Sequence, residues 1–158
     1  MQLREVSPTD PRPAALLDAY FAERAAGFPG PGPYRPARPD PAVFAPPRGV
    51  FLVLEDDGAP VGCGGMRPLA DDDAGPRSEV KHLYVVPGAR GRGLGRRLLA
   101  ELEARARAAG VATLVLDTNR SLEAAGGLYR SAGFVPVPPY NDNPNATDWY
   151  GKRLVAGS

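Results

Sequence analysis

Arginine and glycine alternate in one short segment of the chain, RGRGLG at positions 90–95, directly before an apolar-striped helical sequence. The first turn of a helix exposes backbone N–H groups that have no intrahelical partner, and the helix dipole makes that end positive. Three glycines let an anion approach this backbone closely: Gly91, Gly93 and Gly95. Four arginines add positive charge around it: Arg90, Arg92, Arg96 and Arg97. The segment therefore predicts a binding site for a phosphate or a pyrophosphate.

The elements on either side of this segment have the clearest patterns in the sequence. Residues 78–86 (SEVKHLYVV) indicate a strand that ends at Pro87-Gly88. Residues 93–110 indicate a helix that ends at Gly110, with charged i,i+4 pairs on its wet side. Its apolar stripe consists of Leu94, Leu98, Leu99 and Leu102. A strand, a tight turn, a glycine-rich loop and a helix in this order would aim the loop amides at a ligand.

Two familiar nucleotide-binding patterns, GxGxxG and GxxxxGK[ST], do not occur in this sequence. The string from Arg90 to Gly95 does fit [RQ]-x-x-G-x-[GA]. A second segment, LYRSAGF at 128–134, follows an expected strand, VATLVLDT at 111–118. Together these segments resemble the two signatures of the GNAT superfamily of N-acetyltransferases, over roughly the last half of the chain.

The resemblance implies that acetyl-CoA is the cofactor and assigns contacts to it position by position. The pyrophosphate would lie against Arg90, Gly91, Arg92, Gly93, Leu94, Gly95 and Arg96. The backbone of Leu83, Tyr84 and Val85 would hold the acetyl carbonyl and the pantetheine arm. Many family members contact CoA with an asparagine seven residues before the tyrosine of the second signature, which is Tyr129 here. In this sequence that position is Leu122. Asn119, about one helical turn earlier, is the remaining candidate for this contact.

Two further side chains matched by the resemblance would carry the chemistry. Glu79, eleven residues before Arg90, would take the proton from the acceptor ammonium, because a protonated amine cannot attack a thioester. An ion pair with Arg77 or Lys81 is the alternative for Glu79. Tyr129 would give a proton to the departing CoA thiolate, and its alternative is an ordinary half-buried aromatic side chain on a short helix.

The order of expected elements, β-α-(loop)-β-β-β-α-β-α-β-β, indicates an α/β fold. Strands are expected at 3–6, 50–55, 60–69, 78–86, 111–118, 134–137 and 149–155, and helices at 13–24, 93–110 and 122–132. Residues 70–77 (ADDDAGPR) are expected to form a loop with a solvated acidic tip. Together with the resemblance, this order implies a GNAT-type mixed, mostly antiparallel central sheet flanked by helices, in a single domain spanning 1–158.

Two polar segments lie between the expected elements. Residues 27–47 have too many prolines for regular structure and too few aliphatic residues for a core. A solvated loop fits them, and so does a lid or binding wall that presents Tyr34 and Arg35. The tail segment 140–149 fits either a structural turn or a wall of the acceptor cleft, and contains Tyr140, Asn141, Asp142, Asn143 and Trp149.

Composition excludes several classes of protein. The 158 residues carry a formal net charge of +1, which disfavours nucleic acid and membrane partners. A single cysteine, Cys63, excludes an intrachain disulfide and a cysteine-based metal site, and we expect it in the core. His82 is expected to be a packed or surface side chain, and no His/Asp/Glu spacing resembles a metal site. With no apolar segment of signal or membrane-spanning length, a cytoplasmic location is expected.

The leading interpretation is an acetyl-CoA-dependent N-acetyltransferase that acts on the amine of a small molecule. A protein N-terminus or a lysine is the alternative acceptor. A CoA-binding sensor without catalysis is disfavoured because both Glu79 and Tyr129 are present. A nucleic-acid-binding module is disfavoured because no aromatic stacking platform accompanies the arginine cluster. The oligomeric state, a homodimer included, is left open.

Overall fold

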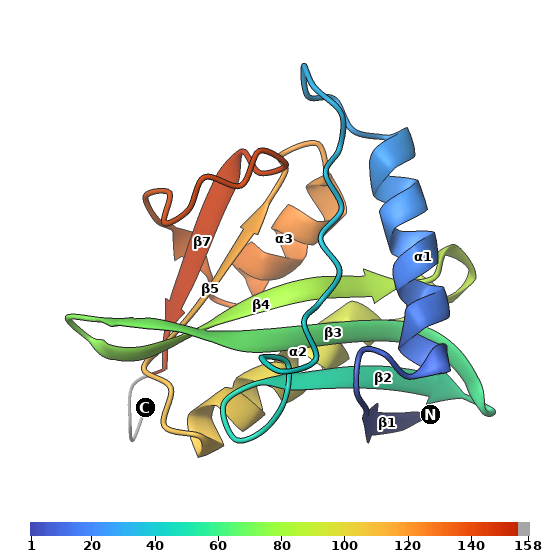
Figure 1. The fold of residues 1–158 in the computed structure, drawn as a ribbon, viewed down its shortest axis with the longest axis horizontal. Helices are drawn as coiled ribbons and strands as arrows, with labels where there is room; N and C mark the ends of the chain where they lie inside the picture. The colour runs from blue at the N-terminus through green and yellow to red at the C-terminus, as the bar shows by residue number, and fades with distance from the viewer. Residues whose placement is uncertain (155–158) are drawn as a thin grey trace.

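The computed structural model describes residues 1–154, which form a seven-stranded sheet with three α-helices packed on it (Figure 1). The elements are β1 Gln2–Glu5, α1 Pro11–Ala26, β2 Val50–Asp56, β3 Ala59–Asp72, β4 Gly75–Val85, a 3-10 turn Pro87–Ala89, α2 Leu94–Ala108, β5 Thr113–Thr118, α3 Glu123–Ser131, β6 Val135–Pro136 and β7 Asp148–Arg153. The strands lie in the order β1-β2-β3-β4-β5-β7-β6, and only β4 and β5 run parallel. This arrangement confirms the predicted mixed, mostly antiparallel α/β fold.

The expected elements differ from the observed ones mainly at their ends. The loop expected at 70–77 is wrong, because β3 continues to Asp72 and β4 begins at Gly75, which leaves a two-residue turn. Both strands project beyond the core here, so their polar side chains stay in solvent, and the acidic tip is exposed as expected. The strands expected at 3–6 and 134–137 lie at 2–5 and 135–136. The last strand ends at Arg153, and Val155 lies outside the described residues.

The sheet buries one apolar cluster on each face. On one face the leucines of α2 pack with Tyr129 of α3, and on the other Phe21 of α1 packs with residues of the sheet. β2 serves both clusters because its side chains alternate: Leu52 belongs to the first and Phe51 to the second. In Figure 1, α1 lies in front of the sheet and α2 behind it. Within residues 1–154, no helix combines the length and the apolarity needed to cross a membrane.

Phe44, in the proline-rich segment before β2, is part of the core. Only 4% of it is exposed, and its ring centroid lies 6.1 Å from that of Phe51. The expectation that this segment adds nothing to the core is therefore wrong. One aromatic side chain buries as much surface as several small aliphatic ones, so a low aliphatic count was a poor guide.

β4 and β5 pair over a short length only. Their register runs from Arg77↔Thr113 to Glu79↔Val115, although β4 continues to Val85 and β5 to Thr118. The two strands diverge after this point (Figure 1). From Val80 onward, the edge of β4 that faces β5 therefore has no strand partner.

A β-bulge lies in the part of β4 that pairs with β3 but not with β5. Between its pairs with Gly65 and Cys63, β4 has one residue more than β3, and His82 takes a φ of 60°. The extra residue reverses the alternation of side chains. Val80 thus packs in the α2 cluster, whereas Tyr84 packs in the α1 cluster.

The bulge places His82 among aromatic rings. The centroids of Phe44 and Phe21 lie 5.7 and 5.8 Å from that of the imidazole. Burial, helped by the positive charges of Lys81 and Arg67, lowers the pKa of His82 from 6.5 to about 3. His82 is therefore neutral at physiological pH. Of the two expectations, a packed or a surface side chain, the packed one is confirmed.

We expect His82, the only histidine of the chain, to make the fold sensitive to mild acid. The unfolded chain takes up this proton near pH 6.5, whereas the folded chain does so only near pH 3, so the free energy of unfolding falls as the pH drops below 6.5. At pH 5 the loss from His82 is about 2 kcal/mol. Chemical denaturation at pH 7.5 and pH 5 should show this extra loss in the wild type compared with His82→Asn, since asparagine tolerates a positive φ. Equal losses in the two proteins would contradict a neutral His82 in the folded protein.

Candidate active site

The segment between β4 and α2 forms a concave row of backbone amides. Gly91 and Gly93 take φ values of 82° and 74°, in the left-handed region that glycine adopts without strain. The first hydrogen bond of α2 runs from Arg97 N to Gly93 O at 3.1 Å, so the three preceding helical amides have no intrahelical acceptor. Amides converging in this way bind anions. The predicted strand, turn, loop and helix are therefore present in the predicted order.

The arginine side chains of this loop are held by neighbouring groups. Arg90 donates to Glu23 and to the carbonyl of Val85, each at 2.9 Å. Arg92 donates to Asp56 at 3.2 Å. These ion pairs are largely exposed and contribute little to stability, so the arginines remain available to an anion.

A cavity of about 520 Å³ opens above this loop, between α1, β4, α2 and α3. Most of the residues predicted to contact CoA line it: Leu83, Tyr84, Val85, Arg90, Gly91, Gly93, Leu94, Gly95 and Arg96. Arg92 and Asn119 are not among its lining residues. The structure thus gathers the predicted loop and the predicted strand segment around a single space, here called the loop cavity.

Asn119 uses its side chain within the protein. Its amide donates to the carbonyl of Asn145 at 3.2 Å, and its carbonyl accepts from the backbone of Ser121 at 3.0 Å. Only 3% of the residue is exposed. These contacts fix the segment that leads from β5 to α3 against the tail loop.

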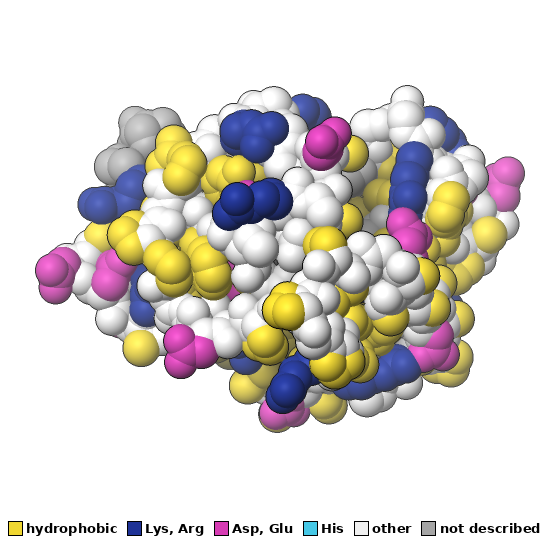
Figure 2. All heavy atoms as spheres, turned by 90° about the horizontal axis from the view of Figure 1, so that it is seen from above, with side chains coloured by type: hydrophobic (Ala, Val, Ile, Leu, Met, Phe, Trp, Pro, Cys, Tyr) yellow, Lys and Arg dark blue, Asp and Glu magenta, His cyan; other side chains and the backbone are white. Residues whose placement is uncertain are grey.

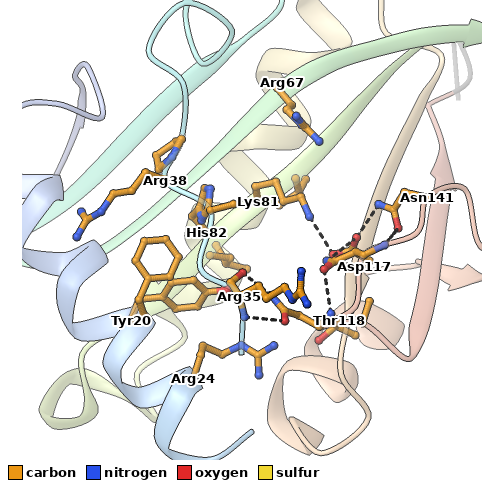
Figure 3. A pocket seen from close by; sticks show the side chains of 18 of the residues that line it. Tyr20, Arg24, Arg35, Arg38, Arg67, Lys81, His82, Asp117, Thr118 and Asn141 are labelled. Atoms are coloured by element: carbon orange, nitrogen blue, oxygen red, sulfur yellow. Dashed lines mark hydrogen bonds and ion pairs between the residues drawn. The ribbon is translucent and has the colours of Figure 1, made fainter. Parts of the chain in front are cut away.

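A second cavity of about 440 Å³, here called the cleft, adjoins the loop cavity (Figure 3). Its walls come from α1, the proline-rich segment, β3, β4, the end of β5, α3 and the tail loop, which is the polar segment 140–147 before β7. Both sequence segments considered as binding walls contribute, including Tyr34 and Arg35 on one side and Asn141 and Asn143 on the other. Figure 2, seen from above Figure 1, shows the surface hollowed between the α1 side and the β5–β7 side.

The two cavities meet at Tyr129. Six residues line both: Tyr20, Arg24, Leu83, Leu122, Ala125 and Tyr129. The Tyr129 hydroxyl makes no hydrogen bond within residues 1–154, although only 8% of the residue is exposed. Burial raises the pKa of Tyr129 well above its usual value of 10, so its phenol stays protonated. An unpaired O–H donor therefore stands where the two spaces join.

Glu79 is completely buried and its carboxylate is fully occupied. One oxygen accepts from Arg67 at 2.9 Å, and the other accepts from the Tyr140 hydroxyl at 2.5 Å and lies 3.6 Å from Lys81. It is not among the residues that line either cavity. Of the two ion-pair partners that the sequence suggested for Glu79, Lys81 lies beside it, whereas Arg77 donates to the carbonyl of Ala70.

Arg67 replaces Arg77 because of the strand register. Arg67 lies directly opposite Glu79 in the β3–β4 ladder. The expected loop at 70–77 is longer than the observed two-residue turn, and the length of the turn sets which residues of β3 and β4 lie opposite each other.

Asp117 is a cleft residue that the sequence did not single out. It sits near the end of β5 and accepts from Lys81 at 3.0 Å, as Figure 3 shows, and from Asn141 at 2.8 Å and Asn143 at 3.2 Å. Burial opposes ionisation, but Lys81 and the two amides outweigh it and keep the pKa of Asp117 below 3.8. A polar residue at the carboxyl end of a buried strand was the available signal.

The model of the acetyltransferase (GNAT) family matches residues 14–134, which is most of the chain. The chain belongs to this family. A GNAT protein uses acetyl-CoA as the acetyl donor.

Two relatives of this GNAT protein carry names of different acetyltransferases. The chain is 42% identical over 108 residues to an IAA acetyltransferase of Azospirillum brasilense, covering 66% of this chain and 69% of the relative. It is 41% identical over 88 residues to an amino-acid acetyltransferase of Azotobacter vinelandii, covering 56% of this chain but 19% of that protein. The match to the second relative thus involves a small part of its length.

A solved structure supports the fold assignment. The Salmonella typhimurium protein yncA, solved with its cofactor acetyl-CoA, superposes with a TM-score of 0.68 at 21% identity and covers 100% of this chain and 96% of its own. The two chains therefore share the same overall fold.

Gly93→Val should abolish acetyl-CoA binding without unfolding the protein. A Cβ at Gly93 would meet no protein atom within 4 Å, so a side chain there would occupy ligand space and disturb the left-handed turn. We expect the rise in melting temperature that acetyl-CoA causes in the wild type to disappear.

Gly110→Val is the matched control for this substitution. Gly110 also takes a left-handed φ, 79°, and also has no atom within 4 Å, but it lies at the other end of α2. Both variants should lose on the order of 1–2 kcal/mol from the backbone alone. A Gly93→Val protein that keeps the full acetyl-CoA shift would show that the loop assignment is wrong.

Proposed function

We propose that this GNAT protein transfers the acetyl group of acetyl-CoA to the amine of a small molecule, by direct attack within a ternary complex. The observation that supports this most is the junction of the loop cavity and the cleft at Tyr129. A thioester reaching in from one cavity would meet an amine held in the other, which removes most of the entropic cost of bringing the two together.

The loop cavity would hold the donor. The amides around Gly91 and Gly93 would bind the CoA pyrophosphate, and the pantetheine arm would run along the unpaired edge of β4 at Leu83, Tyr84 and Val85. Backbone N–H groups on that edge could polarise the acetyl carbonyl and stabilise the oxyanion of the tetrahedral intermediate. Arg92 and Asn119, outside the cavity lining, are given no direct contact in this proposal.

The dimensions of the cleft favour a small acceptor over a protein segment. Its volume of about 440 Å³ falls within the usual range for small-molecule sites. Its rim is closed where the proline-rich segment meets the tail loop, since the backbone of Arg35 exchanges two hydrogen bonds with the side chain of Asn145. The name of the Azotobacter relative, an amino-acid acetyltransferase, agrees with a small amine as acceptor.

The reaction needs a neutral amine, an attack on the thioester carbon and a proton for the leaving sulfur. The amine nitrogen attacks the carbonyl carbon, the C–S bond of the intermediate breaks, and the thiolate takes the proton of the Tyr129 hydroxyl. The nitrogen loses its extra proton as the amide forms, and through water this proton restores the Tyr129 phenol, which its raised pKa keeps protonated. The pKa values of Asp117 and His82 are both lowered, which makes them poor bases. We propose that the ammonium loses its proton to water in the open cleft.

Glu79 in this proposal is a positioning residue. Its buried carboxylate holds Arg67, Lys81 and Tyr140 in place, and it lines neither cavity, so it does not meet an acceptor bound in the cleft. Because Lys81 in turn holds Asp117, these contacts fix the floor of the cleft.

Tyr129→Phe should lower kcat on the order of 100-fold and leave acetyl-CoA binding unchanged, because only the departing thiolate needs the hydroxyl. Thiol release in the presence of an amine panel, together with calorimetric titration of acetyl-CoA, measures the two effects. The wild type should release CoA only when an amine is present, and a protein that binds acetyl-CoA but never releases thiol would support a sensor.

Tyr150→Phe is the control for Tyr129→Phe. Tyr150 is also buried, and its ring centroid lies 6.3 Å from that of Tyr129, but its hydroxyl bonds to Arg130 and it lines neither cavity. Its kcat should stay near the wild-type value. If Tyr129→Phe keeps full kcat as well, another group protonates the thiolate.

Glu79→Gln separates a positioning residue from a general base. Removing one charge from a buried ion-pair cluster costs about 3 kcal/mol, so we expect a clearly lower melting temperature. The pH–rate profile should keep its shape, with the rate rising as more amine becomes neutral. Glu103→Gln, which also removes a carboxylate paired with two cations but on α2, controls for loss of charge. A rate defect at neutral pH that fades as the pH rises would instead establish Glu79 as the base.

A further inference from the structure

The cleft contains more positive than negative charge. Five basic side chains line it: Arg24, Arg35, Arg38, Arg67 and Lys81. Two acidic side chains line it: Asp40 and Asp117. The whole chain carries a net charge of only +1, so this excess is local. A concave site with uncompensated positive charge attracts an anionic ligand.

Three of the five cations already have carboxylate partners: Arg38 with Asp18, Arg67 with Glu79, and Lys81 with Asp117. Arg24 and Arg35 have no carboxylate partner within residues 1–154. The Nε atom of Arg24 is also buried without any hydrogen-bond partner. A buried donor left unpaired is costly, so a ligand that accepts from Arg24 would gain binding energy.

Neighbouring residues hold the guanidinium of Arg24 and the backbone of Arg35, and neither contact is an ion pair. The guanidinium of Arg24 lies 5.2 Å from the centroid of the Tyr34 ring. The backbone N–H of Arg35 donates to Asn145 at 3.1 Å, and its carbonyl accepts from Asn145 at 2.8 Å. Figure 3 shows Arg24 extending from α1 and Arg35 from the proline-rich segment, on the side of the cleft toward Thr118. The guanidinium of Arg24 and the backbone from which the Arg35 side chain extends are therefore in place before any ligand arrives.

Building on the proposed acetyl transfer, we propose that the acceptor amine also carries a carboxylate and that Arg24 and Arg35 bind it. Guanidinium groups suit a carboxylate because their N–H donors match its two oxygens. The ionised Asp117 on another wall would attract the ammonium end of the same molecule. Because Arg24 lines both cavities, the bound carboxylate would lie close to the point where amine and thioester meet. Free α-amino acids combine these features.

Asp40 is the remaining charged residue of the cleft lining. Its carboxylate accepts from the backbone N–H of Ala42 at 2.9 Å and makes no ion pair within residues 1–154. Asp40 caps the turn that leads to Phe44 and forms no ion pair with Arg24 or Arg35.

The test compares each amino acid of a panel with its own carboxamide, which keeps the amine and the side chain but removes the negative charge. Acetyl transfer from acetyl-CoA is followed by thiol release and by mass of the product. We expect the wild type to have a kcat/KM on the order of 10-fold or more higher for the acids, the size expected for hydrogen bonds to a charged group.

Arg24→Gln and Arg35→Gln should each raise KM for the acids about 10-fold, leave the carboxamides nearly unchanged and leave KM for acetyl-CoA unchanged. Arg24→Lys and Arg35→Lys should recover part of the loss, because they restore charge without the two-pronged geometry. Arg153→Gln, an exposed arginine outside both cavities, is the charge-matched control. Melting temperatures of all variants confirm that they are folded.

Several results would overturn the proposal. Equal or faster transfer to the carboxamides would reject the carboxylate while leaving amine acetylation intact. A rise in KM for acetyl-CoA in Arg24→Gln, with unchanged acid preference, would assign that arginine to the donor. No transfer to any member of the panel, despite an intact acetyl-CoA-induced thermal shift, would instead reject the small-amine function on which the proposal rests.

Discussion

The early end of the pairing between β4 and β5 is the constraint on which the rest of the site depends. Three residue pairs, ending at Glu79↔Val115, hold the two strands together, and beyond them both strands continue without a ladder between them. Unpaired backbone groups are costly unless something bonds to them, so this stretch suits a ligand that brings hydrogen-bond partners. The loop cavity and the cleft both open along it.

Side chains replace the missing ladder at the point where the strands separate. Glu79 occupies the last paired position and is fully buried, and Lys81 reaches across the gap to Asp117. The bulge at His82 then changes which side of β4 each later side chain faces, and so directs Tyr84 toward α1. Charge pairing and a single extra residue thus hold open a space that continued strand pairing would have closed.

The cleft is completed by two segments far apart in the chain. Arg35 and Asn145, 110 positions apart, are joined by two hydrogen bonds, and both line the cleft. These two loops supply about half of the residues that line the cleft and none of those that line the loop cavity apart from Gly27, so the two cavities draw partly on different parts of the sequence.

Local patterns in the sequence determined the strand–loop–helix around Gly93 and the leucine stripe of α2. They also determined the order of elements and the position of Tyr129 on α3. Each of these features depends on residues close together in the chain. Tertiary structure decided the rest. Glu79 was visible as a candidate, but its partner Arg67 follows from the strand register. The role of Asp117 follows from side chains that two other segments, β4 and the tail loop, bring to it. The unpaired state of Arg24 and Arg35 also became visible only in the folded chain, because whether a charge has a partner depends on which distant residues surround it.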